Sequence, residues 1–161
     1  MKILAYVLFA FSALLASCHR APIVVNADEI AATKQLNEKY HGLIVGHWHH
    51  FSQTEFKEIT QEFVFKGDGT YTGHILYRSR QQVMIGGKPM LTDWTKQIDE
   101  DVEGQWELMY SKSQSRNLLR LSSNSHFIGM GVIEFFDANQ SKLIIKSPLA
   151  IESGRIEFSR K

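Results

Sequence analysis

The sequence has 161 residues, of which 43% are hydrophobic and 22% are charged, a composition typical of one globular domain. Its 18 basic residues nearly balance its 17 acidic residues. Loss of residues 1–17 as an export signal would remove one lysine and no acid, which leaves a neutral mature chain. Such an even mixture lacks the basic stripe of nucleic-acid-binding proteins, so we expect no nucleic acid as a partner.

The first segment predicts a signal peptide over residues 1–17. Lys2 forms a short basic region, and an almost wholly apolar run follows from Ile3 to Leu15. This run is shorter than the roughly 20 residues that a membrane-spanning helix requires. We therefore expect a cleaved export signal rather than a permanent transmembrane anchor.

Cys18 is the only cysteine, and it follows the small residues Ala16 and Ser17. The segment Leu15-Ala16-Ser17-Cys18 resembles the lipobox of bacterial lipoproteins, in which the cysteine is lipidated and becomes the mature N-terminus. The resemblance implies a membrane anchor at Cys18. His19, standing where an aspartate would signal retention, resembles the outer-membrane sorting pattern of enteric-type bacteria. We therefore expect a protein of the bacterial envelope, attached to the outer membrane and facing the periplasm; the alternative is an ordinary signal peptide followed by a chance cysteine.

Residues 18–41 predict a lipidated tether and a short helix. Asn26 or Asp28 is suited to cap a helix from Asp28 to about Tyr40, with Gly42 past its end. The apolar positions of this segment are sparse. We expect the helix to lie on a surface or to plug the mouth of a barrel.

From Gly42 onward nearly all signals predict β-strands. Phe63 and Phe65 alternate with polar residues, and Asp68-Gly69 is typical of a tight hairpin turn. Further strands are expected at 81–85, 90–98 and 104–111, with residues 99–104 acting as a separating turn, and four more follow toward the C-terminus.

About nine strands without helices between them predict an antiparallel meander rather than a parallel α/β sheet. Closing the meander into an up-and-down barrel removes the edge strands that invite aggregation. We therefore predict an all-β fold, an antiparallel up-and-down barrel of about eight or nine strands over residues 42–161, preceded by the short helix. A two-sheet sandwich is the alternative.

Gly46-His47-Trp48 stands on the first expected strand, just after the helix. It resembles the Gly-x-Trp signature of lipocalins and of small bacterial lipocalin-like lipoproteins. In that family the tryptophan packs at the closed end of the barrel, often beneath an arginine of the last strand. The resemblance implies a lipocalin-like barrel in which Arg160, or less favourably Arg155, covers Trp48. It also implies binding of a small apolar ligand or a protein partner.

Strand alternation divides the histidines between two faces. Residues i and i+2 point the same way, so an inward Trp48 places His50 inside the barrel and His47 and His49 outside. The inward His50 is a candidate ligand-binding residue. The other candidates are aromatic residues expected on inner faces: Tyr71, Tyr77, Trp106 and Tyr110. They are equally able to fill the barrel, because eight strands enclose just enough space for side chains or one small ligand.

The outward pair, His47 and His49, can form part of a zinc or copper site, with His74 as a third ligand. A periplasmic metal-binding or metal-sensing module is therefore the alternative function, although our main expectation is no cofactor. Sequence motifs of nucleophilic, phosphate-binding and zinc-dependent enzymes are missing. We expect a non-enzymatic protein.

Overall fold

The computed structural model describes residues 26–125, 128, 131–149, 152 and 154–161. The predicted signal peptide and Cys18 lie outside the described residues. The elements are α2 (Ala27–Ile44), β1 (Gly46–Gln53), β2 (Lys57–Phe65), β3 (Thr70–Ser79), β4 (Gln82–Ile85), β5 (Lys88–Leu91), β6 (Thr95–Ser111), β7 (Arg116–Ser123), β8 (Gly131–Ala138), β9 (Lys142–Lys146) and β10 (Arg155–Arg160). Within the described ranges, no helix is both long enough and apolar enough to cross a membrane.

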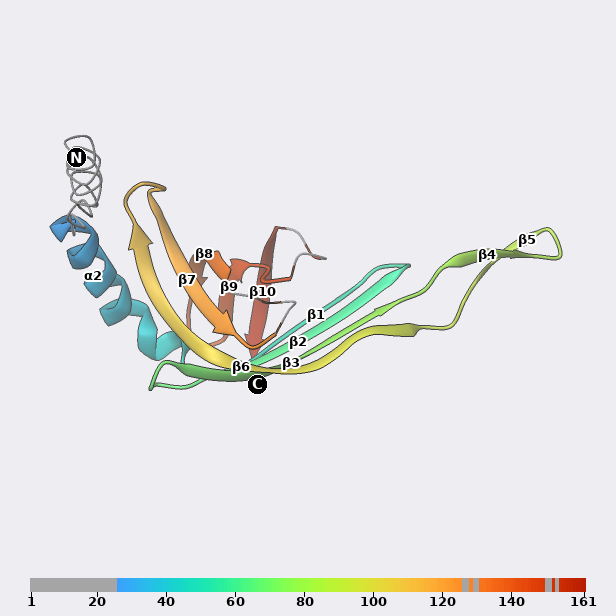
Figure 1. The fold of residues 1–161 in the computed structure, drawn as a ribbon, viewed down its shortest axis with the longest axis horizontal. Coiled ribbons are helices and arrows are strands. Elements are labelled where there is room, and N and C mark those ends of the chain that lie inside the picture. The colour runs from blue at the N-terminus through green and yellow to red at the C-terminus, as the bar shows by residue number, and fades with distance from the viewer. Residues whose placement is uncertain (1–25, 126–127, 129–130, 150–151, 153) are drawn as a thin grey trace, which may run out of the picture.

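Eight of the strands close into an antiparallel barrel. Each pairs with its neighbour along the chain in the order β1-β2-β3-β6-β7-β8-β9-β10, and β10 returns to pair with β1 (Figure 1). The predicted all-β, up-and-down barrel with a short N-terminal helix is thus confirmed, and the architecture is consistent with a lipocalin-like barrel. The remaining strands, β4 and β5, form a separate two-stranded sheet that projects away from the barrel (Figure 1).

Alternation along each strand builds the interior. On β2, Ile59, Gln61, Phe63 and Phe65 are buried while the intervening residues are half-exposed. The Phe65 ring contacts Tyr71 and Trp106, with ring centroids 5.7 Å and 5.5 Å away. Each buried aromatic side chain contributes a large apolar area, so this cluster supplies much of the stability of the fold.

Helix α2 plugs one end of the barrel, as one of our two expectations proposed. The Tyr40 ring packs edge-on against Phe135, with centroids 5.0 Å apart, and the His41 ring stacks on Trp106 at 4.9 Å. The cap is Asn26, whose side chain accepts a hydrogen bond from the backbone N–H of Asp28 at 3.2 Å. The helix thereby closes the apolar end of the barrel.

The predicted end of this helix near Tyr40 was wrong. The helix continues through Gly42 to Ile44, which is fully buried. The Ile44 carbonyl accepts a hydrogen bond from Trp48 Nε1 at 2.6 Å. Tertiary burial of this last turn therefore outweighs the weak helix propensity of Gly42.

A second correction concerns residues 99–104, which were expected to form a turn. They lie in the middle of β6, a continuous strand of 17 residues that pairs with β3 on one side and β7 on the other. The predicted strand over 90–98 is instead divided between β5 and the start of β6. Acidic side chains at 99, 101 and 103 are tolerated because they point outward, while Ile98 and Val102 are buried.

Candidate functional site

The closed end of the barrel carries the predicted contact between Trp48 and the last strand. The Arg160 guanidinium lies 4.4 Å from the centroid of the Trp48 ring. It also donates hydrogen bonds to the carbonyls of Leu43, at 2.7 Å, and Val45, at 3.1 Å. Arg160 thus joins β10 to the end of α2, as the family resemblance implied, whereas Arg155 stacks on Phe136 instead.

Gly46 is a glycine because nothing larger fits. Its φ is +147°, and a Cβ atom built on it would lie 2.2 Å from Arg160 Nη1. The glycine of the Gly-x-Trp motif therefore makes room for the arginine that covers the tryptophan.

A polar layer crosses the barrel interior above this apolar end. The strand register places His50 opposite Gln61, Gln61 opposite Ile75, and Ile75 opposite Glu100. Gln61 is fully buried, and its Oε1 has no hydrogen-bond partner among the described residues. An inward glutamine on a face that is otherwise apolar marks this level as different from the rest of the core.

Glu152 is the centre of the polar layer and comes from the segment between β9 and β10. Its Oε1 accepts hydrogen bonds from His50 Nε2, at 3.0 Å, and Ser52 Oγ, at 2.8 Å. Its Oε2 accepts bonds from Gln61 Nε2, at 2.7 Å, and Ser147 Oγ, at 3.2 Å. A carboxylate with two donors on each oxygen has nearly all its acceptor capacity filled. Glu152 therefore joins its own segment to β1 and β2.

The hydrogen bonds of His50 favour its cationic form, because both ring nitrogens face acceptors. Its Nδ1 lies 2.9 Å from the Glu157 carbonyl oxygen, which only accepts, so Nδ1 carries a proton. Its Nε2 faces the Glu152 carboxylate, and the two side chains are only 11% and 12% exposed. Burial lowers the pKa of His50, but the bonds to Glu152 and to the Glu157 carbonyl outweigh it and raise the pKa above 6.5.

The pKa of Glu152 moves in the opposite direction. Burial raises this pKa, yet the donors from His50, Ser52 and Ser147 outweigh burial and hold it below 4.5. Both shifts favour the ionised form of the pair. Neither ring nitrogen is free to take a proton from Ser52, whose hydroxyl bonds to the same carboxylate oxygen as His50. The arrangement lacks the serine–histidine bond of a nucleophilic triad. It instead holds the segment of Glu152 against β1 and β2, and we call this set of contacts the latch.

The five predicted ligand-binding residues are not brought together. His50 lies in the polar layer, while Tyr71 and Trp106 are buried in the aromatic cluster at the end near α2. Tyr77 is only partly buried and pairs with Ile59, toward the opposite end. Tyr110 lies beside α2, where its backbone N–H bonds to Thr33 Oγ1 at 2.9 Å. Tyr71, Trp106 and Tyr77 therefore pack at different levels of the core rather than around one common space.

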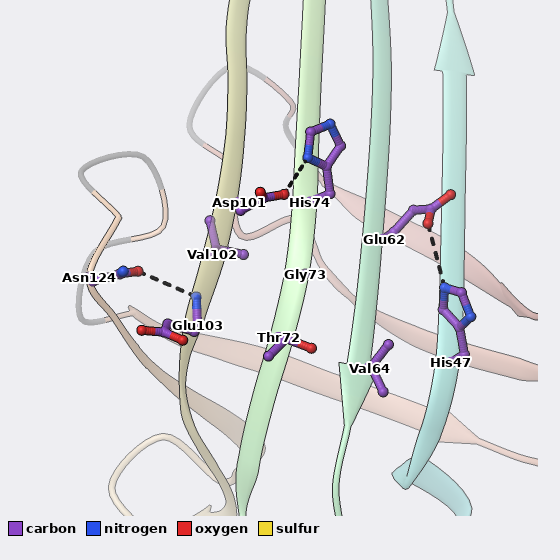
Figure 2. A pocket seen from close by; sticks show the side chains of 10 residues that line it. All are labelled: His47, Glu62, Val64, Thr72, Gly73, His74, Asp101, Val102, Glu103 and Asn124. Carbon is purple, nitrogen blue, oxygen red and sulfur yellow. Dashed lines mark hydrogen bonds and ion pairs between the residues drawn. The ribbon is translucent and has the colours of Figure 1, made fainter.

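A hollow on the outer surface lies over β1, β2, β3 and β6. It has a volume of about 600 Å³ and is lined by His47, Glu62, Val64, Thr72, Gly73, His74, Asp101, Val102, Glu103 and Asn124. Figure 2 shows two pairs at its rim, His47 with Glu62 and His74 with Asp101, and Val64 and Thr72 on the same face of the sheet. A second hollow shares Thr72, Glu103 and Asn124 with the first, and a third, toward β7, shares Gln105 with the second.

The structure brings His47 and His74 to this hollow but not His49. His47 Nε2 lies 3.5 Å from Glu62, and His74 contacts Asp101 at 2.8 Å and Asp99 at 3.2 Å. Each ring is therefore already paired with a carboxylate. In the part of the chain that the structure describes, no group of three or more metal-binding side chains is arranged to hold an ion.

Two polar residues in otherwise apolar patterns of the sequence indicate the polar layer. Gln61 interrupts the apolar face formed by Ile59, Phe63 and Phe65. Glu152 is a lone acid in the mainly apolar segment at 148–152. A buried polar residue needs a partner, so these two positions were the available indication of an internal contact.

Comparison with protein-family models, with curated proteins and with solved structures found no match for this chain.

Proposed function

We propose that this protein is a lipid-anchored, non-enzymatic component of a bacterial envelope that binds a protein partner through the outer surface of its lipocalin-like barrel. The observation that carries the proposal is the contrast between interior and exterior. Tyr71 and Trp106 pack against neighbouring rings, whereas the hollow of about 600 Å³ is open and has a charged rim.

The chemistry of the hollow favours a basic segment of the partner. The Glu62 carboxylate already has two partners in this structure, Lys161 and His47. Their bonds to it outweigh the opposing effect of burial and lower its pKa. Asp101 and Glu103 share the outer face of β6, and their side chains face solvent. The strand register places Val64 and Thr72 between His47 and Glu103. Their side chains suit the aliphatic stem of a lysine or arginine whose head reaches these carboxylates.

Site-specific photo-crosslinking in cells tests this proposal. A photoreactive residue at Thr72 should capture one partner. Asp101→Asn/Glu103→Gln should weaken capture by up to about thirtyfold, since exposed ion pairs each contribute about 0.2–1 kcal/mol. The matched control is Glu38→Gln/Glu55→Gln, which removes the same charge elsewhere. Equal loss in the two double variants, or no crosslink from Thr72, would overturn the proposal.

Two further measurements separate this function from neighbouring ones. Mass spectrometry of the membrane-extracted protein tests the anchor, which is refuted by an unmodified Cys18. Native mass spectrometry of the same material tests the version in which the barrel holds a small apolar ligand. A lipid-like mass that persists through purification would favour that version over the partner-binding one.

Metal binding is a second candidate because His47 and His74 line the same hollow together with three carboxylates. Titration with Zn²⁺ and Cu²⁺ should be compared between wild type and His47→Ala/His74→Ala, with His49→Ala as the control. The candidate fails if the double variant binds as tightly as wild type. It also fails if wild type binds more weakly than about 10 μM, or about −7 kcal/mol.

A further inference from the structure

The two-stranded sheet formed by β4 and β5, here called the arm, stands apart from the rest of the molecule. It continues the direction of β3 and β6 beyond the barrel, at the opposite end of the long axis from α2 (Figure 1). Hydrogen bonds at its base join Arg80 N to the Phe56 carbonyl, at 3.1 Å, and Thr92 N to the Gln81 carbonyl, at 2.8 Å. An isolated hairpin of this size is only marginally stable in water, so we expect the arm to be stabilised by a binding partner or surface.

The arm is apolar on both of its faces. Val83 pairs with Met90 on one face, and Met84 pairs with Pro89 on the other. The exposed fractions are 68% for Met84, 57% for Ile85, 51% for Met90 and 38% for Leu91. A hairpin that docks on a flat protein surface needs only one apolar face, whereas apolar side chains all round suit an apolar medium.

The charges of the arm have one sign. Residues 79–92 contain Arg80 and Lys88 and no acidic residue, and the first acid, Asp93, follows at the base of the arm. At the base, the Arg80 guanidinium lies 4.4 Å from the centroid of the Trp94 ring. An apolar tip with tryptophan and basic residues at its margin is the composition found where proteins meet a membrane surface. The positive charge is complementary to anionic lipid headgroups.

The geometry of the tip sets the depth of insertion. Gly86 and Gly87 form the turn with φ of +58° and +77°, so the leading end carries no side chain. The outer edges of β4 and β5 retain unpaired backbone groups, which are costly in hydrocarbon. Insertion to the boundary between headgroups and acyl chains, about 5–10 Å deep, buries the apolar side chains and leaves those groups near water.

We propose that the arm inserts its apolar tip into the surface of an anionic phospholipid bilayer. Met84, Ile85, Met90 and Leu91 enter the boundary region, while Lys88 extends its charged head back to lipid phosphates. The arm lies far from the hollow on the barrel wall and at the other end of the molecule from the start of α2. Membrane contact by the arm is therefore separate from partner binding at the hollow and from an N-terminal lipid.

Fluorescence of a labelled arm tests the proposal. The full chain carrying Cys18→Ser has no other cysteine, so Ile85→Cys accepts a single polarity-sensitive dye. The chain is reconstituted into vesicles of phosphatidylcholine alone, or of equal parts phosphatidylcholine and phosphatidylglycerol. With the anionic vesicles, emission should shift to the blue and spin-labelled lipid should quench it. The same dye at Gln114→Cys, in the exposed turn after β6, should stay accessible to an aqueous quencher.

Two variants sharpen the result. Lys88→Glu reverses one charge and should lower the ratio of inserted to free arm about thirtyfold, as expected for two charge units at an anionic surface. Lys146→Glu, the same change on β9, should leave it unaltered. Met84→Asp/Met90→Asp places one acid on each face and should abolish insertion.

Two outcomes would overturn the proposal. One is a dye at residue 85 that remains exposed to the aqueous quencher in every vesicle. The other is protection that appears without vesicles and rises with protein concentration, which would assign the arm to a second copy of this chain.

Discussion

At the end of the barrel covered by α2, Trp48 and Ile44 are fully buried in an apolar core, whereas two residues further along β1 His50 joins the polar layer around Glu152. Two contacts hold Trp48 at the apolar end. One is local, the hydrogen bond to the Ile44 carbonyl four residues earlier, and the other is long-range, the stacking of Arg160. The polar layer depends on contacts that cross about a hundred residues. Burial stabilises the first at any pH, while the second needs two ionised groups.

The largest expected effect breaks the apolar end. Trp48→Ala removes a fully buried indole, its bond to the Ile44 carbonyl and the surface on which Arg160 stacks. We expect the free energy of unfolding in urea to fall by about 3–5 kcal/mol. Phe51→Ala, on the same strand but 51% exposed, should change it by less than about 0.5 kcal/mol. Similar losses in the two variants would contradict the role of Trp48.

Breaking the polar layer comes next. Glu152→Ala leaves the buried His50 cation and three further donors without their acceptor, so we expect a loss of about 3 kcal/mol in urea unfolding. The control is Glu157→Ala, whose carboxylate pairs with Lys142 at a site about half exposed and should contribute about 1 kcal/mol or less. If the control costs as much, the latch is not a distinct element.

A smaller effect tests how Gly46 serves the apolar end. Gly46→Ala introduces a Cβ atom where the Arg160 guanidinium lies, on a backbone with φ of +147°. We expect the free energy of unfolding to fall by about 2 kcal/mol. The contact between Trp48 and Arg160 should be lost, which a change in tryptophan fluorescence would report. Gly42→Ala meets no atom within 4 Å and lies in α2, so it should stabilise by about 0.5–1 kcal/mol. Destabilisation by Gly42→Ala as well would contradict the conclusion that only Gly46 lacks room for a Cβ atom.

The smallest effect is the dependence of the polar layer on pH. The raised pKa of His50 contributes stability below 6.5 that is lost as pH rises through its folded pKa. The lowered pKa of Glu152 contributes stability above 4.5 that is lost as pH falls through its folded pKa. The difference in unfolding free energy between wild type and Glu152→Gln should therefore be largest between pH 4.5 and pH 6.5. It should shrink as pH falls through the folded pKa of Glu152 and as pH rises through that of His50. A difference that is flat with pH would show that the pair is not ionised.

The two ends also differ in how far the sequence predicts them. Strand alternation correctly separated the outward His47 from the inward Trp48 and His50, and the family resemblance pointed to Arg160. The same periodicity cannot say which residue a side chain meets across the barrel, so Glu152 was missed. Residues 99–104 were taken for a turn because acids weaken a strand signal, although alternate acids fit an outward face. Local patterns define faces, while loops that fold back inward depend on the whole topology.

The pairing of β1 with β10 has a consequence for the order in which the protein folds. Arg160 bonds to the Val45 carbonyl across 115 residues of sequence, and the six strand pairs that do not involve β10 leave two open edges until β10 arrives. Contacts of such long range form late, because the loop between them must be ordered first. A nascent chain that ends before β10 is therefore an open, slowly folding sheet.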